Sequence, residues 1–334
     1  MSRVDRATGP LAEPPAAAAS RLGQRRRAAA GIAALVALLA IYPFAFAGAL
    51  NFGVGVVLFA ALATSWDLIG GWAGQLSLGH AAFIGLGAYT FTILTRAQVH
   101  IGLAVLAAAA AGVLLAAAWG FITFRLRGAY FALASIAVAE VLRIVANNWT
   151  SLTGGPEGLS LQDLPRVLGL DLYDRRVEYY LALALLAAAL ATSLFIGTSR
   201  AGYYLEAIRE DQDSSMALGV DPLRMKLFAF CISAALTVSG GCLYAVYLAF
   251  FEPHGVFSLD LSVQLVLMSI VGGMGTVFGP MLGAVVLLSF QEAFRNAFQQ
   301  SSLLIYGILI VIMVRYAPDG LSGRVQLLYR RLAR

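Results

Sequence analysis

Lysine, cysteine and histidine are scarce in this chain, and each scarcity argues against a class of site. Lys226 is the only lysine among 334 residues, and it does not follow a glycine, so the chain lacks the Gly-Lys-Ser/Thr loop that binds the phosphates of ATP. The two cysteines form no Cys-x-x-Cys pair, and the three histidines are too far apart for a metal-ligand motif: His80, His100 and His254. We therefore expect no catalytic centre, cofactor or metal in this chain.

Charged residues are also few, and their scarcity excludes a water-soluble protein. They make up 12% of the sequence, against about 25% in an average soluble domain. Hydrophobic residues make up 60%, and the mean hydropathy is +0.80. Since a membrane-spanning helix uses about 20 apolar residues, this content suffices for about ten spans. The composition predicts an all-α polytopic membrane protein embedded in a lipid bilayer, with no nucleic-acid partner.

Ten apolar runs predict membrane-spanning helices. They lie near residues 28–50, 53–70, 77–95, 101–124, 129–147, 178–197, 227–250, 261–273, 281–297 and 302–317. The run at 261–273 is short and adjoins a Gly-rich stretch, so we expect a broken element that is buried in protein. The transmembrane domain is thus predicted at 28–317, between a disordered cytoplasmic tail at 1–27 and a cytoplasmic C-terminal tail at 318–334.

The distribution of arginine orients these spans. If the N-terminus is cytoplasmic and ten spans alternate, the cytoplasmic side receives most of the arginines, as the positive-inside rule requires. Both termini and the connector 198–226 are then cytoplasmic, and the connector 148–177 is periplasmic. For the first run a cleaved signal peptide is the alternative, but its length and the many later spans favour an uncleaved helix.

The connector 198–226 carries the signals of a short helix–turn–helix. A first helix is predicted at 203–209 and a second at 213–218, whose acidic start suits the helix dipole. Gly219 stands where a helix commonly ends in a left-handed residue. Asp221-Pro222 can begin the next helix as its N-cap and first residue. Such a compact element is suited to dock on a cytoplasmic partner, and a solvated loop is the alternative.

Two Gly-rich stretches interrupt the apolar runs. The first, 70–79, reads Gly-Gly-Trp-Ala-Gly-Gln-Leu-Ser-Leu-Gly, and the second, 272–284, reads Gly-Gly-Met-Gly-Thr-Val-Phe-Gly-Pro-Met-Leu-Gly-Ala. A helix that begins after the first stretch could present free N–H groups to an anion such as a carboxylate. The alternative is that the glycines only let helices pack closely.

These three segments resemble the permease subunits of branched-chain amino acid ABC importers. The connector is similar to their coupling loop, whose motif reads Glu-Ala-Ala, three residues, Gly; here Asp213-Ser214-Ser215 precede Gly219 at that spacing. Both Gly-rich stretches look like the signatures of the second permease of the pair. The stretches 126–133 and 148–156 extend the resemblance, which covers about residue 30 to the C-terminus.

The resemblance implies a permease fold that forms the translocation path for branched-chain or related amino acids in the bacterial inner membrane. It implies as partners a sister permease in a heterodimer, two ATP-binding subunits that hydrolyse Mg-ATP, and a periplasmic solute-binding protein that docks on the outer connector. The coupling loop would include Ala207, Ile208, Arg209, Glu210, Asp211, Asp213, Ser214, Ser215 and Gly219.

Ionisable residues inside the predicted spans are few. Glu140 and Arg143 lie three residues apart and can pair, and Glu292 and Arg295 repeat the spacing. A zwitterionic amino acid could exchange with the first pair, whereas the alternative is a pair that fixes helix packing. Asp67 is expected to cap or contact the turn 74–79. The candidate translocation path comprises Gln75, Ser77, Gly79, Glu140, Arg143, Gly273 and Gly275.

Two other functions remain open from the residues. Urea and short-amide ABC importers use similar permeases, so the resemblance does not by itself decide the solute. An ion-coupled secondary transporter would need acids and broken helices near the middle of the membrane. Glu140 is the only acidic residue that the sequence places deep inside a predicted span for such a site. An ion-coupled transporter would also leave the structured connector 198–226 unexplained.

Overall fold

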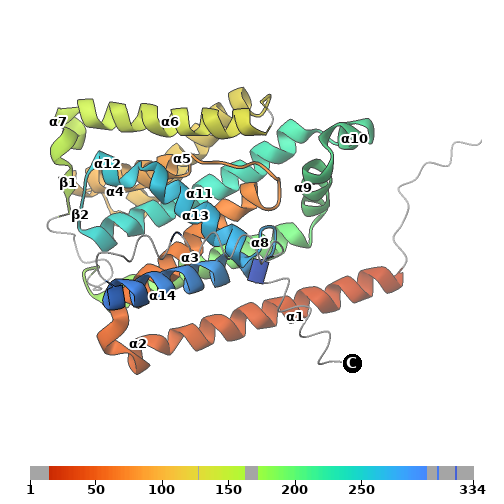
Figure 1. Ribbon diagram of the computed structural model, residues 1–334, viewed down its shortest axis with the longest axis horizontal. Helices are drawn as coiled ribbons and strands as arrows, with labels where there is room; N and C mark the ends of the chain where they lie inside the picture. The colour runs from red at the N-terminus through yellow and green to blue at the C-terminus, as the bar shows by residue number, and fades with distance from the viewer. Residues whose placement is uncertain (1–14, 127, 162–171, 299–306, 308–319, 322–334) are drawn as a thin grey trace, which may run out of the picture.

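The computed structural model describes residues 15–126, 128–161, 172–298, 307 and 320–321 (Figure 1). The helices are α1 (Pro15–Ala40), α2 (Tyr42–Ala45), α3 (Leu50–Gly70), α4 (Ala81–Arg96), α5 (Ile101–Thr123), α6 (Ala129–Asn148), α7 (Thr150–Thr153), α8 (Arg175–Gly197), α9 (Arg200–Glu210), α10 (Gln212–Ala217), α11 (Pro222–Leu248), α12 (Pro253–Val256), α13 (Leu259–Gly272) and α14 (Gly279–Phe298). Two 3-10 turns (Ala47–Ala49 and Gly155–Glu157) and two short strands complete the described structure. The strands β1 (Leu159–Ser160) and β2 (Phe250–Phe251) pair antiparallel, with Leu159 opposite Phe251.

Seven helical segments of the described residues are long and apolar enough to cross a membrane. They are Ala28–Ala45, Leu50–Gly70, Ile101–Thr123, Ala129–Asn148, Arg175–Gly197, Pro222–Leu248 and Pro253–Gly272. These segments confirm an all-α polytopic membrane protein, but they do not confirm the predicted number of about ten. The runs predicted at 77–95 and 281–297 correspond to α4, which has only 16 residues, and to α14, and neither helix is among the seven. The tenth predicted run, 302–317, lies outside the described residues except for Gly307.

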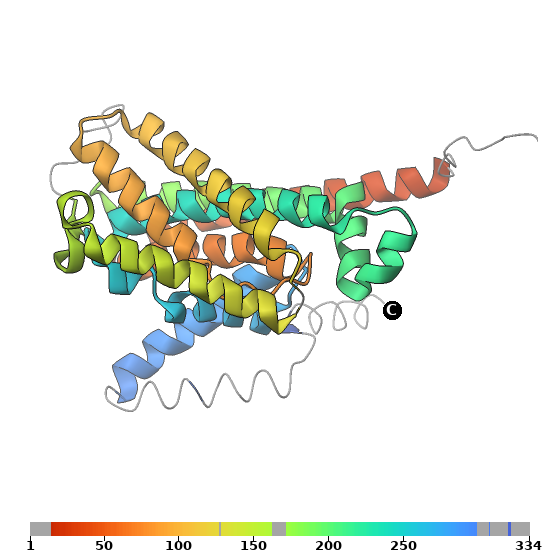
Figure 2. The same ribbon diagram turned by 90° about the horizontal axis from the view of Figure 1, so that it is seen from above.

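The long helices lie side by side along the long axis of the molecule (Figures 1 and 2). Helix α8 leads to one end, where α9 and α10 follow, and α11 returns from that end. Helix α7 and the strand pair lie at the opposite end, next to the end of α6. The connector 198–226 and the described part of the connector 148–177 are therefore at opposite ends of the bundle, as the alternating spans predict.

Helix α3 forms the centre of the bundle. Of its 21 residues 17 are buried, and the helix packs against α8, α11, α13 and α14. Its residues are small or apolar on every side, which is typical of a helix enclosed by protein. By contrast, only 8 of 23 residues of α5 and 5 of 20 residues of α6 are buried, and these two helices lie on the outside of the bundle.

Several predicted boundaries are corrected by the structure. Helix α1 begins at Pro15, so residues 15–27 are helical although the sequence predicted a disordered tail there; residues 1–14 lie outside the described part. Helix α4 begins at Ala81, four residues later than predicted, because its Gly-rich start is irregular. The expected broken element at 261–273 is present: α12 and the 14-residue α13 form one interrupted segment that ends at Gly272.

Candidate functional site

The predicted helix–turn–helix is present as α9, α10 and the turn to α11, and we call residues 200–221 the α9–α10 element. Asp211 caps α10: its Oδ1 atom accepts hydrogen bonds from the backbone N–H groups of Asp213 (2.9 Å) and Ser214 (3.1 Å). The hydroxyls of Ser214 and Ser215 donate to the carboxylate and the carbonyl of Asp211, each at 2.7 Å. The serines that replace the two alanines of the coupling motif therefore tie the turn to its cap.

The end of α10 also has the predicted geometry. Gly219 has a φ of 88°, and Asp221 accepts a hydrogen bond from Arg224 N at 3.2 Å as the N-cap of α11, with Pro222 in the first turn. Lys226 is buried, and its ammonium group donates to Gln212 Oε1 at 2.6 Å. The only lysine of the chain thus anchors α10 to α11, so the element is held rigidly against the bundle.

The outward side of the α9–α10 element carries large apolar side chains among exposed acidic residues such as Glu206, Glu210 and Asp213. Leu205 and Ile208 point into the bundle and are buried, whereas Ala207 is exposed. Leu218 is 85% exposed. Three further large side chains of the element are exposed, and together with Leu218 we call them the α10 patch: Tyr203, Tyr204 and Met216. Exposed apolar side chains gathered on a projecting element are typical of a protein–protein contact.

Arg209 connects α9 to both Gly-rich stretches. Its Nη1 atom donates a hydrogen bond to the carbonyl of Gly71 at 2.9 Å. A β-carbon on Gly74 would lie 2.6 Å from Arg209 Cγ, and one on Gly275 would lie 2.7 Å from Arg209 Nη1. The arginine therefore lies directly against residues 71–74 and Gly275, and only glycine leaves it that space.

Asp67 joins the same cluster from the end of α3. Its side chain is almost completely buried and accepts hydrogen bonds from the backbone N–H of Gly275 at 3.0 and 3.1 Å. The carboxylate of Asp67 therefore bonds to the second Gly-rich stretch, whereas the sequence suggested that it caps or contacts the turn 74–79. Gly275 adopts a φ of 70°, which brings its N–H to this carboxylate from the second Gly-rich stretch instead. Asp67, Arg209 and Gly275, together with Gly71, form what we call the Arg209 cluster.

The irregular stretch 71–80 is held by side chains of several helices. Trp66 of α3 donates from Nε1 to the carbonyl of Ser77 at 2.7 Å, and Ser135 of α6 accepts from Leu78 N at 2.9 Å. The ring nitrogens of His80 lie 2.9 Å from the hydroxyls of Ser77 and of Ser233 in α11. These contacts satisfy polar groups that lipid could not, which is the condition for irregular backbone within a membrane.

The start of α4 does not form the anion site that the sequence suggested. Ala81 N donates to Ser262 Oγ of α13 at 2.9 Å, while the N–H groups of Ala82 and Phe83 are bonded to the carbonyls of Gly79 and His80. All of these residues are buried. Since the N–H groups are already bonded, the alternative interpretation applies here, namely that the stretch serves close packing. At Gly79 any β-carbon would overlap the carbonyl of Ser135.

Gln75, another candidate path residue, differs from its neighbours. Its backbone N–H donates to Ile69 O at 3.0 Å, but its side-chain Oε1 is buried and has no hydrogen-bond partner within the described structure. Ser77, in contrast, is fully buried and bonded to His80. Gly273 has a φ of 113° at the end of α13 and leads into Gly275.

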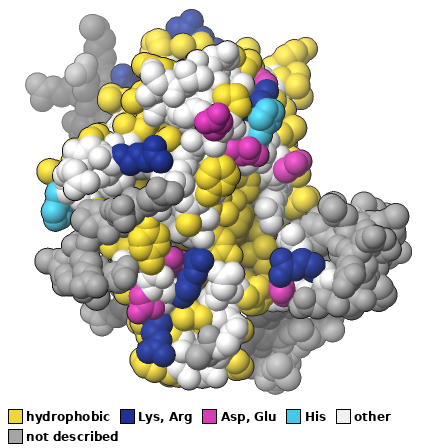
Figure 3. All heavy atoms as spheres, turned by 90° about the vertical axis from the view of Figure 1, so that its left-hand side faces the viewer, with side chains coloured by type: hydrophobic (Ala, Val, Ile, Leu, Met, Phe, Trp, Pro, Cys, Tyr) yellow, Lys and Arg dark blue, Asp and Glu magenta, His cyan; other side chains and the backbone are white. Residues whose placement is uncertain are grey.

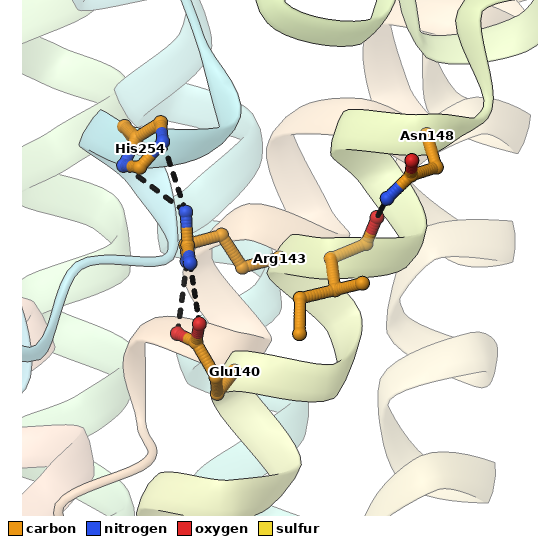
Figure 4. Close-up of polar contacts among 5 residues, drawn as sticks. Glu140, Arg143, Asn148 and His254 are labelled. Atoms are coloured by element: carbon orange, nitrogen blue, oxygen red, sulfur yellow. Dashed lines mark hydrogen bonds and ion pairs between the residues drawn. The ribbon is translucent and has the colours of Figure 1, made fainter.

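Glu140 and Arg143 pair as predicted, and a third side chain joins them (Figure 4). Arg143 donates from Nε to Glu140 Oε2 at 2.8 Å and also bonds the other carboxylate oxygen through Nη2. Its Nη1 atom lies 2.9 Å from Nε2 of His254, which α12 supplies. We call these three residues the α6–α12 cluster. They do not contact the Arg209 cluster.

His254 and the serines that hold the irregular stretch were missed by sequence reasoning. Ser135, Ser233 and Ser262 are single hydroxyl residues in apolar runs, where a polar residue is the only signal of an interhelical hydrogen bond. His254 follows Pro253 in a turn between two predicted spans, so only the packing of α12 on α6 reveals its partner.

Residues 48–314 match the family model described as "Branched-chain amino acid transport system / permease component". The chain belongs to this permease family. It is 33% identical to the high-affinity branched-chain amino acid transport system permease protein LivM of Escherichia coli K12, over 87% of this chain and 74% of that protein. It is 23% identical to the corresponding LivH permease of the same organism, over 80% of this chain and 91% of that protein. A probable LivM permease of Methanocaldococcus jannaschii is 24% identical over 87% of this chain and 90% of that protein.

No solved structure matches this chain. Within the permease family, identity is higher to the LivM protein of E. coli than to its LivH protein. Since both are named as permeases of a high-affinity branched-chain amino acid transport system, the family contains two related permeases in one organism. The resemblance inferred from the Gly-rich stretches and the connector is thereby confirmed.

Proposed function

We propose that this chain is a permease subunit of an ATP-driven importer that carries branched-chain amino acids across the bacterial inner membrane. It would pair with a sister permease of the LivH type, and two ATP-binding subunits would bind and hydrolyse Mg-ATP. A periplasmic binding protein would deliver the solute. The observation that carries the proposal is the α9–α10 element, a capped and anchored helix pair whose arginine reaches both Gly-rich stretches.

The Arg209 cluster supplies a route from an ATP-binding subunit to the membrane helices. The α10 patch would be held in a cleft of that subunit, which would move the whole α9–α10 element when ATP closes it. Arg209 would then pull on the carbonyl of Gly71 and press against Gly275. Because Gly71 follows α3 and Gly275 precedes α14, the movement would tilt these helices with respect to one another.

The proposed orientation places the α9–α10 element in the cytoplasm and α7 with the strand pair in the periplasm. The arrangement of arginines along the sequence supports it. The N-terminus and the C-terminus would both be cytoplasmic, and the connector 148–177 would receive the binding protein. The names of the relatives favour branched-chain amino acids over urea or short amides, and an ATP-driven importer over an ion-coupled transporter.

Purification and reconstitution test this function. We expect the tagged chain, extracted from native membranes in a mild detergent, to bring with it a second permease and ATP-binding subunits that carry Walker motifs. In proteoliposomes with the binding protein, the complex should take up leucine only when ATP is supplied. Uptake of urea in place of leucine would show that the chain belongs to an ATP-driven importer of a different solute. A chain that purifies alone and transports with an ion gradient would contradict the proposal.

A further inference from the structure

One side of α6 is exposed along most of the helix. Among its exposed residues, five recur at helical spacing: Leu133, Ala137, Glu140, Ile144 and Asn148. Glu140 lies eight residues before the end of α6, which places it about 12 Å along the axis from that end. It is therefore well inside a helix that is long and apolar enough to span the membrane.

A carboxylate at this depth cannot face acyl chains at low cost. The Glu140 side chain is 48% exposed and that of Arg143 is 22% exposed, so the ion pair is only partly covered by this chain. Charged side chains inside membrane proteins face water-filled cavities or other protein segments, because lipid does not solvate them. The exposed side of α6 thus faces an aqueous or protein-lined space. Figure 3 views the end at which α6 terminates, and it shows acidic and basic side chains and a histidine gathered near the top.

We propose that the α6–α12 cluster is the part of the translocation path that receives the charged head of a zwitterionic α-amino acid. This inference rests on the proposed function and adds the residues that contact the solute. Arg143 binds the α-carboxylate and Glu140 binds the α-ammonium group. The solute passes between this face and the sister permease.

The hydrogen-bond inventory of the cluster leaves room for such a ligand. A guanidinium has five N–H donors, of which two are directed to Glu140, while Nη1 lies 3.1 Å and 2.9 Å from the two ring nitrogens of His254. The second N–H of Nη2 thus remains for a carboxylate, and Nη1 can turn one of its two N–H groups from His254 to the same ligand. A glutamate carboxylate has about four acceptor positions, so Glu140 can accept from an ammonium group while it stays paired. Both the ion pair and a zwitterion are neutral, so binding adds no net charge to the membrane.

The surroundings of the cluster fit an aliphatic side chain. Val141 is 58% exposed and Ile144 is 48% exposed, and both lie on α6 beside Glu140. The cluster therefore binds the amino and carboxylate groups that all amino acids share. The aliphatic surface beside it contacts the side chain of the solute without selecting its shape. Selection among amino acids would rest with the binding protein.

The chain contains a matched control for this site. Glu292 and Arg295 have the same residue types and the same spacing near the end of α14, and Arg295 Nη2 donates to Glu292 Oε1 at 2.8 Å. They line a cleft of about 700 Å³ that α3, α11 and α13 also border. If the α6–α12 cluster contacts the solute, neutral substitutions in that cluster will lower uptake, whereas the same substitutions in the second pair will leave uptake unchanged.

The first experiment measures leucine uptake by the complete importer in proteoliposomes. We expect Glu140→Gln and Arg143→Gln each to lower uptake about tenfold, the loss of one charge-assisted hydrogen bond, while the yield of assembled complex and its ATPase activity without solute are unchanged. Glu292→Gln and Arg295→Gln should leave uptake unchanged. Normal uptake in the first two variants, or a loss only in the second two, overturns the proposal. Absence of leucine uptake by the unsubstituted complex would instead contradict the proposed function.

The second experiment separates a solute contact from a structural ion pair. In a background in which both native cysteines are replaced, the Val141→Cys variant should react with a water-soluble, membrane-impermeant thiol reagent, and leucine with its binding protein should slow the reaction. The Leu106→Cys variant on α5, whose parent side chain is 66% exposed, provides the lipid-facing control and should not react. If the thiol of the Val141→Cys variant is as unreactive as that of the Leu106→Cys variant, α6 faces lipid and the proposal is wrong.

Discussion

Arg209 donates a hydrogen bond across 2.9 Å to the carbonyl of Gly71, and this contact joins α9 to the irregular stretch that leads into α4. The two residues are 138 positions apart in the sequence. Gly275, whose N–H is bonded to Asp67, lies against the same guanidinium nitrogen and next to Gly71. A single side chain of the α9–α10 element therefore contacts both interruptions of the helical bundle.

The first prediction concerns this contact. Arg209→Gln shortens the side chain and removes its charge, so the bond to Gly71 is lost while the backbone hydrogen bonds of α9 remain. We expect leucine uptake by the reconstituted importer to fall about tenfold, with ATP hydrolysis retained, because the ATP-binding subunit still docks but no longer moves the Gly-rich stretches. Arg224→Gln is the control, since the Arg224 side chain is 80% exposed and pairs only locally with Asp221. Equal uptake in the Arg209→Gln and Arg224→Gln variants would show that Arg209 does not take part in the coupling.

The second prediction concerns the turn at Gly219. A β-carbon there would meet no atom within 4 Å, so any effect of substitution comes from the φ of 88° alone. Gly219→Val forces a β-branched residue into this conformation at a cost of about 1–3 kcal/mol, and it should uncouple transport from ATP hydrolysis while the chain still inserts. Gly219→Asn should retain most uptake, because asparagine tolerates positive φ. Unchanged uptake in the valine variant would contradict the coupling role.

The third prediction concerns the α10 patch. Leu218→Asp places a charge at the most exposed apolar side chain of the α9–α10 element, and we expect the ATP-binding subunits to be lost on purification while the sister permease remains bound. Leu152→Asp, in α7 at the other end of the bundle, should leave the ATP-binding subunits in place. The ratio of subunits by quantitative mass spectrometry measures the effect. Retention of the ATP-binding subunits by the Leu218 variant would show that they dock elsewhere.

The fourth prediction concerns the buried hydrogen bonds of His80 with Ser77 and Ser233. His80→Ala removes the partner of two buried hydroxyls, Ser77 and Ser233, and leaves a cavity among aromatic rings. We expect a destabilisation of about 2–4 kcal/mol, seen as a lower melting temperature of the detergent-solubilised complex. His100→Ala should lower the melting temperature less, because it removes one exposed capping hydrogen bond, to Gly102 N, and leaves no buried cavity. A melting temperature unchanged by His80→Ala would mean that the stretch is held without this histidine.

The local signals of the sequence predict single elements well, and contacts between distant elements poorly. Gly219, Asp221 and Pro222 have the roles expected of them, because caps and left-handed residues depend on a few neighbouring residues. The hydrogen bond from Gly275 N to the Asp67 carboxylate was not predicted, since only the packing of α3 against the end of α13 brings Gly275 to it.

The same distinction separates the two contacts of Arg143. Its pairing with Glu140 followed from helical spacing, whereas His254 is 111 positions away and could not be inferred. The sequence left an anion site and close packing open at the start of α4 for a similar reason: Ser262, which binds Ala81 N, lies in a later helix.

The central position of α3 has a consequence for how the protein is made. Helix α3 is synthesised before the four helices that enclose it, and the earliest of these, α8, begins at Arg175. Trp66 and Asp67 are buried in the finished bundle. Until these four helices have been synthesised, none of them can cover the two side chains. The nascent chain must therefore hold a carboxylate in or near the membrane until α8 and the later helices have been translated. A ribosome-stalled chain that ends before α8 should accordingly remain accessible to crosslinking from the insertion machinery through residue 66 or 67, and lose that crosslink once α11 has been inserted.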